Sequence, residues 1–238
     1  DLNRDGRLDL VLSIHHERAR NKVFLNEGIR DGVPHFRDVT IEVGLPKRLN
    51  QKAPHMEIRD FDNDGWPDLY FSAAWLDKSG AVKPLLFRHL GMKDGLPRFA
   101  VNGPLDEPMV YYPAGPGGDF DNDGRTDLFL INWYRDNHSR LLRNVSPPKH
   151  WLQVRVLGKR MNRMGIGAKI TLRSSKGAFL GFQEITTGYG FASGQPAIAH
   201  FGLGNHESVS LELEFPDGKK IRRAEVVADQ RLTIEEEK

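Results

Sequence analysis

Carboxylates recur at a fixed spacing in three short stretches, which begin at residues 1, 60 and 119. The second stretch reads DFDNDGWPD and the third DFDNDGRTD, so aspartates occupy positions 1, 3, 5 and 9 and a glycine follows the third aspartate. The first, DLNRDGRLD, has an asparagine at position 3. Oxygen ligands at alternate positions, with a glycine where the chain turns sharply, suit a hard divalent cation such as Ca²⁺. We therefore interpret all three stretches as calcium loops that hold two to three ions.

Each loop offers the same kinds of ligand atom. The side chains at positions 1, 3, 5 and 9 supply oxygens, and position 7 supplies its backbone carbonyl. Because Asn3 replaces a carboxylate, the first loop should bind calcium more weakly than the other two. We expect the apolar residue at position 2 (Leu2, Phe61 or Phe120) to point into the core. The predicted metal residues are Asp1, Asn3, Asp5, Arg7 and Asp9; Asp60, Asp62, Asp64, Trp66 and Asp68; and Asp119, Asp121, Asp123, Arg125 and Asp127.

Other interpretations of these stretches agree less well with the sequence. An EF-hand loop ends with a bidentate glutamate at position 12, but that position holds Leu12, Phe71 and Leu130 here, so each loop should enter a strand. Magnesium uses fewer protein carboxylates and keeps more water. Metal-free turns are the plain alternative, because aspartate, asparagine and glycine favour turns in any case. Three copies at equal spacing argue against that alternative.

The loops belong to a longer internal repeat. Both intervals between loop starts are 59 residues long, and each loop is followed by a short apolar run typical of a strand buried on both faces. Four short strand candidates per period are typical of a β-propeller blade. Because a closed propeller needs about four to eight blades, and residues 1–146 hold about two and a half, we expect upstream blades to be missing from this chain.

The pattern changes after residue 146. A Pro-Pro pair follows at residues 147–148, the metal loop does not return, and residues 150–238 contain seven short strand candidates with Gly-rich turns. Such a pattern predicts a β-sandwich or a small barrel. The predicted fold class is therefore all-β, with a partial propeller over residues 1–146 followed by a second β domain over residues 150–238.

The composition narrows the possible functions. The 238 residues include no cysteine, which excludes disulfides and thiolate chemistry. No apolar run approaches the ~18 residues of a membrane-spanning helix, so we expect no membrane span. Three bound Ca²⁺ ions would raise the formal net charge from +2 to about +8 and favour acidic partners such as sulfated or uronic-acid glycans. Lysines and arginines are scattered without a nucleic-acid motif, so we expect no nucleic-acid partner.

Both halves of the chain resemble known families. The acidic loops that run into Asp-Leu strands, with NKVFLNEG at 21–28 and FRDVT at 36–40, resemble FG-GAP/VCBS repeats, the calcium-loop propeller blades also found in integrin alpha chains. The second half resembles the ASPIC/UnbV domain, although that family usually has tryptophan where this chain has Phe215. The matching segments are HWLQV at 150–154, NRMGIGA at 162–168, GYG at 188–190, HFGLG at 200–204 and FPDG at 215–218.

These resemblances imply a function that the residues alone do not specify. Blades followed by this domain are similar to the cartilage acidic protein-like family and its bacterial relatives. That similarity implies a secreted, non-enzymatic protein, extracellular, periplasmic or on the cell surface, that binds polysaccharide or extracellular matrix with calcium. The alternatives are a protein–protein adhesion module of the integrin-like propeller type, and an enzyme or accessory subunit acting on polysaccharide. For catalysis the spare acids are Glu57, Glu107 and Glu184, and no spacing pairs them.

Aromatic residues near the loops are the candidate contacts for a sugar ring, because a sugar can stack on an aromatic face. Trp66 lies inside a metal loop, and Trp75, Trp133 and Tyr134 follow the predicted strand ends. The loops of a propeller gather on one face, so these residues are predicted weak ligand contacts. Local packing is the alternative for each of them.

Overall fold

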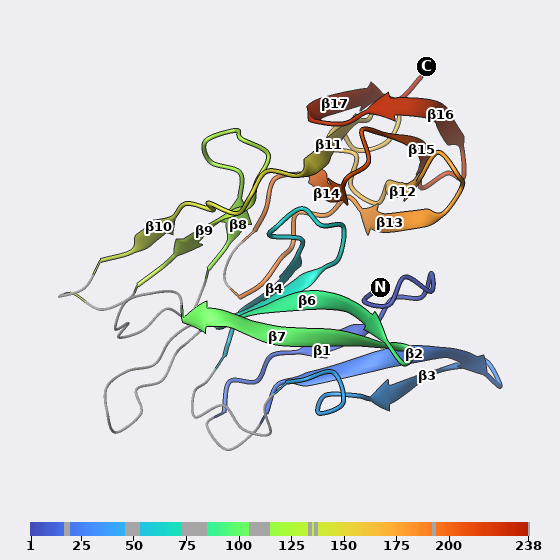
Figure 1. The fold of residues 1–238 in the computed structure, drawn as a ribbon. Coiled ribbons are helices and arrows are strands. Elements are labelled where there is room, and N and C mark those ends of the chain that lie inside the picture. Colours follow the sequence, from blue (N-terminus) through green and yellow to red (C-terminus); the bar gives the residue numbers. More distant parts are fainter. Residues whose placement is uncertain are drawn as a thin grey trace.

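The described part of the chain is built from strands. In the computed structural model it comprises residues 1–16, 20–45, 53–72, 85–104, 115–132, 135, 138–191 and 194–237. These residues form seventeen strands in five sheets and no helix (Figure 1). The all-β prediction is confirmed. No helix in this part of the chain is long and apolar enough to cross a membrane.

One sheet is a complete propeller blade of four antiparallel strands. Its order is β4 (Met56–Arg59), β5 (Asp68–Phe71), β6 (Leu85–Lys93) and β7 (Leu96–Pro104). The second acidic loop joins β4 to β5. A blade therefore begins one strand before its loop, and the repeat counted from loop to loop is offset by one strand from the structural blade.

Two three-stranded sheets complete the blade region. In the first blade the strands β1–β3 follow the first loop; in the third, β8 precedes its loop and β9 and β10 follow it. Three, four and three strands agree with the predicted two and a half blades. The strand bounds are β1 (Leu10–Leu12), β2 (Lys22–Arg30), β3 (Val33–Asp38), β8 (Gly117–Gly118), β9 (Asp127–Leu130) and β10 (Arg140–Leu142).

Neighbouring blades pack through equivalent positions. The position-2 side chain of each of the first two loops meets the strand that comes after the next loop, so each blade buries apolar side chains of its neighbour. This burial is worth about 1.5–3 kcal/mol for each large side chain. Leu2 clusters with Leu69 and Phe71 between the first and second blades, and Phe61 clusters with Leu128 and Leu130 between the second and third.

Phe120 departs from the predicted burial of position 2. Leu2 and Phe61 are 1% and 4% exposed, but Phe120 is 52% exposed. Phe129 and Leu141, a cross-strand pair in the same blade, are also exposed. The prediction for Phe120 is wrong because a position-2 side chain is buried by the following blade, and the described residues place no blade after the third.

The remaining seven strands form a two-sheet sandwich, which lies beside the blades in Figure 1 (yellow to red). The sheets have the orders β14-β11-β17 and β13-β12-β15-β16, and alternate side chains from both fill one hydrophobic core. All seven strands predicted after residue 150 are present. They are β11 (His150–Leu157), β12 (Lys169–Arg173), β13 (Phe179–Glu184), β14 (Ile198–Gly204), β15 (Ser208–Glu214), β16 (Lys220–Val227) and β17 (Gln230–Glu235).

Candidate metal centres

The three acidic loops share one backbone conformation. Position 4 has a positive φ in each, 57° at Arg4, 55° at Asn63 and 64° at Asn122. The glycine at position 6 has φ values of 84°, 89° and 85°. Glycine adopts such angles freely and asparagine more easily than most residues. The repeated sequence therefore produces a repeated turn, and each loop enters a strand as predicted.

The carboxylate at position 1 closes the turn. Its Oδ1 atom accepts the N–H of position 5 at 3.0 Å in all three loops. Its Oδ2 atom accepts the N–H of the position-6 glycine at 2.9, 2.6 and 3.1 Å in loop order. These bonds hold the carboxylate with its two oxygens toward the centre of the loop.

The carboxylate at position 9 ties the loop to its blade. Asp68 Oδ2 accepts the N–H of Phe61 at 3.0 Å, and Oδ1 accepts the N–H of His89 in β6 at 2.7 Å. Asp9 and Asp127 accept the equivalent pair of bonds. Asp68 and Asp127 are each 2% exposed. A carboxylate so buried needs compensating partners, which the backbone supplies in part and a cation would complete.

Two loops bring three carboxylates together at one point. In each, oxygens from positions 1, 3 and 9 lie within 4.8 Å of one another, and an all-oxygen donor set of this kind fits Ca²⁺. The first loop forms no such group among the described residues, because its position 3 is Asn3. The two groups are Asp60, Asp62 and Asp68, and Asp119, Asp121 and Asp127.

The position-5 aspartates lie differently from the other three. The Oδ1 atoms of Asp64 and Asp123 accept the N–H of position 7 at 2.8 and 2.9 Å. Asp64 Oδ2 lies 3.8 Å from Arg88 and 3.9 Å from Lys149, and Asp123 Oδ2 pairs with Arg125. Their role as ligands stays a prediction, as does that of the position-7 backbone carbonyls of Arg7, Trp66 and Arg125.

Burial and mutual repulsion perturb the carboxylates of the second loop. Burial, followed by repulsion from Asp68 and Asp64, raises the pKa of Asp60 well above its ordinary value. Burial also raises the pKa of Asp64, and it raises the pKa of Asp68 to about 7. Carboxylates that resist ionisation at neutral pH are stabilised by a divalent cation, which must displace their protons to bind.

We expect the calcium-induced rise in Tm to grow between about pH 5 and pH 8. Unfolded aspartates lose their protons near pH 3.9, whereas metal-free folded Asp60 and Asp68 keep theirs to higher pH, so ionisation destabilises the metal-free fold as the pH rises. Calcium competes with these protons, and its affinity should rise by about tenfold per pH unit for each carboxylate still protonated. Thermal unfolding with and without calcium across this range measures the effect. A calcium-induced shift that is the same at every pH would contradict the prediction.

Position 4 links the first loop to the second, the second loop to both the third loop and the sandwich, and the third loop to the sandwich. The Arg4 guanidinium donates to the carbonyl of the position-6 glycine in the second loop, and the Asn63 amide donates to the equivalent carbonyl in the third at 2.9 Å. At the third loop, Asn122 Oδ1 instead accepts a hydrogen bond from Arg231 in β17. The amide of Asn122 thus contacts the sandwich, and the amide of Asn63 contacts both the third loop and the sandwich.

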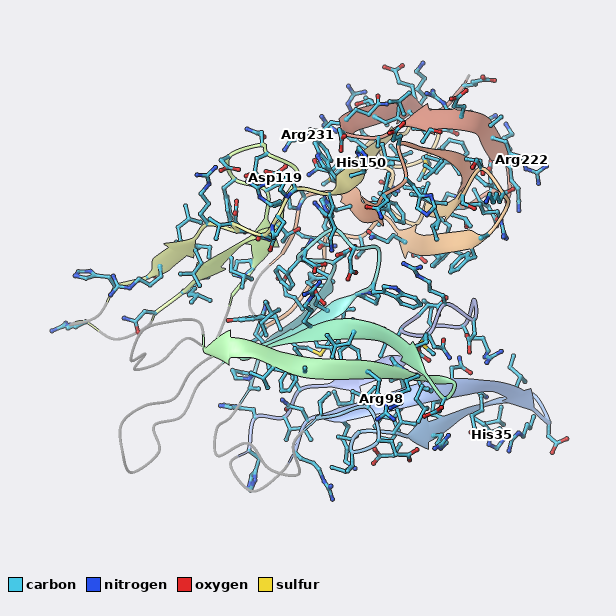
Figure 2. All side chains as sticks on the ribbon, viewed as in Figure 1. His35, Arg98, Asp119, His150, Arg222 and Arg231 are labelled. Atoms are coloured by element: carbon cyan, nitrogen blue, oxygen red, sulfur yellow. The ribbon has the colours of Figure 1, made fainter. Side chains whose placement is uncertain are left out.

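The sandwich also holds the first carboxylate of the third loop. Asp119 Oδ2 accepts hydrogen bonds from Arg231 Nη2 at 2.9 Å and from Gln153 Nε2 at 3.0 Å. Arg231 Nε donates to Gln153 Oε1 at 2.7 Å, which fixes the pair. Figure 2 shows Arg231 and Asp119 on adjoining edges of the sandwich and the third blade. A predicted calcium ligand is therefore shared with the sandwich.

The second loop makes a similar contact. The Gly204 N–H donates to the Asn63 carbonyl at 2.8 Å, and His200 Nε2 bonds Asn63 Oδ1 at 2.9 Å. Burial lowers the pKa of His200 to about 4, so the ring is neutral. Its Nδ1 atom faces the Gln153 Nε2 donor at 3.4 Å, so Nε2 carries the proton and donates it to the amide oxygen. A β-carbon at Gly202 would overlap Asp60 Oδ2. Only glycine allows the sandwich to approach this carboxylate so closely.

A third contact covers the free edge of β4. The Tyr189 hydroxyl donates to the Ile58 carbonyl at 2.8 Å and accepts the Ile58 N–H at 2.9 Å. The Phe191 N–H donates to Nδ1 of buried His55 at 3.0 Å. Buried Glu57 accepts the N–H of residue 117 and pairs with the guanidinium of residue 59. These bonds satisfy an edge strand that would otherwise be open to pairing, and they give Glu57 a structural role.

Trp66 alone among the predicted sugar contacts belongs to the described residues. Its ring stacks on His89 with 4.8 Å between ring centroids, and the Arg4 guanidinium lies 3.8 Å from the Trp66 centroid. Local packing, the alternative considered for this residue, accounts for its position. The other three, Trp75, Trp133 and Tyr134, and the spare acid Glu107, lie outside the described residues.

Residues outside the loops contact them, and the sequence did not single these residues out as contacts. Gln153 and His200 lie in the segments HWLQV and HFGLG that carry the family resemblance, whereas Arg231 lies in an ordinary alternating strand. Inside the loops, position 4 gave a partial signal, because the asparagines Asn63 and Asn122 interrupt an acidic stretch. Asparagine tolerates a positive φ, so these two residues indicated the turn, although not the contacts that their side chains make.

Family models match both parts of the chain, the blades with their acidic loops and the sandwich. A family model described as FG-GAP-like repeat matches residues 1–71, and one described as ASPIC and UnbV matches residues 158–238. The chain therefore combines FG-GAP-like repeats with an ASPIC and UnbV domain, and both resemblances are confirmed.

Relatives of known name are similar to nearly the whole chain, across both the blades and the sandwich. The chain is 31% identical to cartilage acidic protein 1 of Mus musculus over 99% of its length and 32% identical to that of Homo sapiens over 94%. It is 29% identical to that of Xenopus tropicalis over 94%. These alignments cover 35%, 33% and 34% of the relatives, so the chain spans about one third of the length of the curated relatives it matches.

Proposed function

We propose that this chain is a non-enzymatic, calcium-binding module that binds polysaccharide or extracellular matrix outside the cytoplasm, in the extracellular space, the periplasm or at the cell surface. The observation that carries the proposal is the pair of three-aspartate groups, each on a loop between two strands of one blade. In this proposal residues 1–146 are blades of a longer propeller and residues 150–238 are a second domain. The exposed apolar face of the third blade is where a further blade would pack.

The proposed calcium ions stabilise the fold and take no part in a reaction. The aspartates at positions 1, 3 and 9 would hold each ion, joined by position 5 and the position-7 carbonyl, so none of these carboxylates is left for acid–base catalysis. A bound ion neutralises carboxylates that otherwise repel one another. At ~1–2 mM calcium and a dissociation constant near ~0.1 mM, each site would add ~1.4–1.8 kcal/mol of stability.

Two findings support matrix binding. The relatives carry cartilage in their name, and calcium loading would leave the protein with a positive formal charge that favours acidic polymers. The exposed apolar pair Phe129 and Leu141 favours the alternative, protein–protein adhesion through the blades, where no further blade covers them.

Binding to immobilised polysaccharides, with calcium and with a chelator, tests the proposal. We expect retention on at least one acidic or neutral polysaccharide in calcium and its loss on chelation, with no comparable retention on DNA. The matched variant is Asp60→Asn with Asp119→Asn, which removes one carboxylate from each three-aspartate group and should lose the retention in calcium. Absence of binding to every polysaccharide would count against the proposal. Recovery of a protein partner without any glycan would favour the adhesion alternative, and turnover of the polymer would favour the enzyme alternative.

A further inference from the structure

A groove between the second and third blades has an apolar floor. Its cavity volume is about 480 Å³. Asp62 of the second loop and Asp127 of the third both line it, so both candidate metal centres border the same groove. The floor is formed by Phe61, Leu86, Leu128 and Leu142.

Three cationic side chains line this groove, and each comes from a different segment of the chain. Arg88 belongs to β6, Arg143 follows β10, and Lys149 precedes β11. Their side chains are partly exposed. None lies in a basic run of the sequence, so only the packing of the blades collects them.

The cations are paired with the position-3 carboxylates. Arg88 pairs with Asp62 Oδ2, and Lys149 Nζ lies 3.3 Å from the same oxygen. On the third loop, Arg143 Nε lies 2.7 Å from Asp121 Oδ2. Asp62 and Asp121 are also the aspartates that complete the three-carboxylate groups. Calcium and the groove cations therefore use the same carboxylates.

Calcium binding would weaken the attraction between the position-3 carboxylates and the cations of the groove. Without metal, Arg88 and Lys149 both pair with Asp62. A divalent ion held by Asp60, Asp62 and Asp68 would share the charge of that same carboxylate. A carboxylate whose charge is shared with Ca²⁺ attracts a guanidinium or ammonium group less strongly. The calcium-loaded groove would thus present cations able to accept an anion from outside.

We propose that this groove binds a sulfated polysaccharide and that calcium in the second and third loops makes the site available. The proposal rests on the calcium binding proposed above. Arg88 and Lys149 converge on one oxygen atom, which is the geometry that binds a compact anion. A sulfate ester stays ionised and offers three oxygens to converging donors. The apolar face of the sugar ring would lie on the groove floor.

A second cavity, between the second loop and β13, is a weaker candidate. Its volume is about 440 Å³, and its arginines are Arg4 and Arg59. Arg4 bonds a backbone carbonyl, and Arg59 bonds the side chains of Glu57 and Gln195. None of these hydrogen-bond partners is among the predicted calcium ligands, so calcium binding would leave the bonds of both arginines in place.

The test compares the unchanged chain with a double variant that carries both Arg88→Gln and Lys149→Gln. The probe is dextran sulfate, with dextran and polygalacturonate as neutral and carboxylate polymers, at ~0.15 M salt to screen weak surface attraction. We expect the double variant to bind dextran sulfate in calcium at least tenfold more weakly, while its calcium affinity is unchanged or higher. Arg143→Gln alone should weaken binding less, and it serves as a second variant should the double one fold poorly.

The matched control is Lys220→Gln with Arg222→Gln, because these two cations likewise converge on one carboxylate, that of Glu212 on the sandwich. We expect this control to bind dextran sulfate as the unchanged chain does. An equal loss in both double variants would overturn the groove site, because attraction would then follow net charge alone. Tighter binding of polygalacturonate than of dextran sulfate would overturn the choice of sulfate.

Calcium titration separates the failure of this inference from that of the proposed function. If the chain binds calcium but binds dextran sulfate equally well in chelator, the groove proposal is overturned and the calcium loops stand. If titration shows no calcium binding, the proposed function fails first and the groove proposal fails with it.

Discussion

Replacing Asp68 with alanine should destabilise the protein by about 2–5 kcal/mol in the presence of calcium. The Asp68 side chain is 2% exposed, and its oxygens accept the backbone N–H groups of Phe61 and His89. Its removal leaves two buried donors without partners, at a cost of about 1–3 kcal/mol each, and removes a proposed calcium ligand. Urea unfolding in calcium and in chelator measures both contributions. In chelator the destabilisation should be smaller, because the variant also relieves repulsion with Asp60.

Asp62→Asn is the matched control in the same loop. Its Oδ1 atom accepts the N–H of Asp64 at 3.2 Å, and asparagine can keep that bond. We therefore expect this variant to lose much of the stabilisation by calcium but to unfold almost like the unchanged chain in chelator. If Asp68→Ala were as stable as the unchanged chain in calcium, the structural role of the position-9 carboxylate would be wrong.

Replacing Gly202 with alanine should loosen the sandwich from the second loop and weaken calcium binding there by tenfold or more. The added β-carbon would overlap Asp60 Oδ2 and lie 2.5 Å from the backbone Cα of Asn63. Either the sandwich moves away, losing the bonds from Gly204 and His200 to Asn63, or Asp60 leaves its place in the three-carboxylate group. Calcium titration and limited proteolysis between the third blade and β11 measure the two effects.

Gly188→Ala is the control for that substitution. Gly188 belongs to the sandwich, and no heavy atom of the described residues, its two chain neighbours aside, lies within 4 Å of where its β-carbon would stand. We expect this variant to bind calcium and resist protease as the unchanged chain does. If the Gly202→Ala variant kept its calcium affinity and its protease resistance, the close contact between the sandwich and the second loop would be wrong.

The shared carboxylates suggest why the two parts of the chain occur together. Asp60 is covered by the sandwich at Gly202, and Asp119 accepts hydrogen bonds from Arg231 and Gln153. An ion bound in either loop and the sandwich docked on it therefore act on the same oxygens. Any effect of calcium on docking must be matched by an equal effect of docking on calcium affinity.

The sequence by itself determined the loops, their repeat and the strands around them. The bonds that shape a loop join residues no more than seven positions apart, such as position 1 with positions 5 and 6, and position 2 with position 9. Their formation depends on residue types at fixed spacing, which the sequence displays directly. The strands of the sandwich could be predicted equally well from their alternating apolar and polar residues, because side chains on a strand point to opposite faces in turn.

Only the tertiary structure decided what surrounds the loops. Phe120 is exposed and Phe61 buried although their loops begin with the same residues, because burial comes from the next blade. Arg231 reaches Asp119 across 112 positions, and His200 reaches Asn63 across 137. Contacts over such separations depend on how whole sheets pack against one another. No local pattern records that packing, so the shared carboxylates and the cations of the groove emerge only when the blades and the sandwich are assembled.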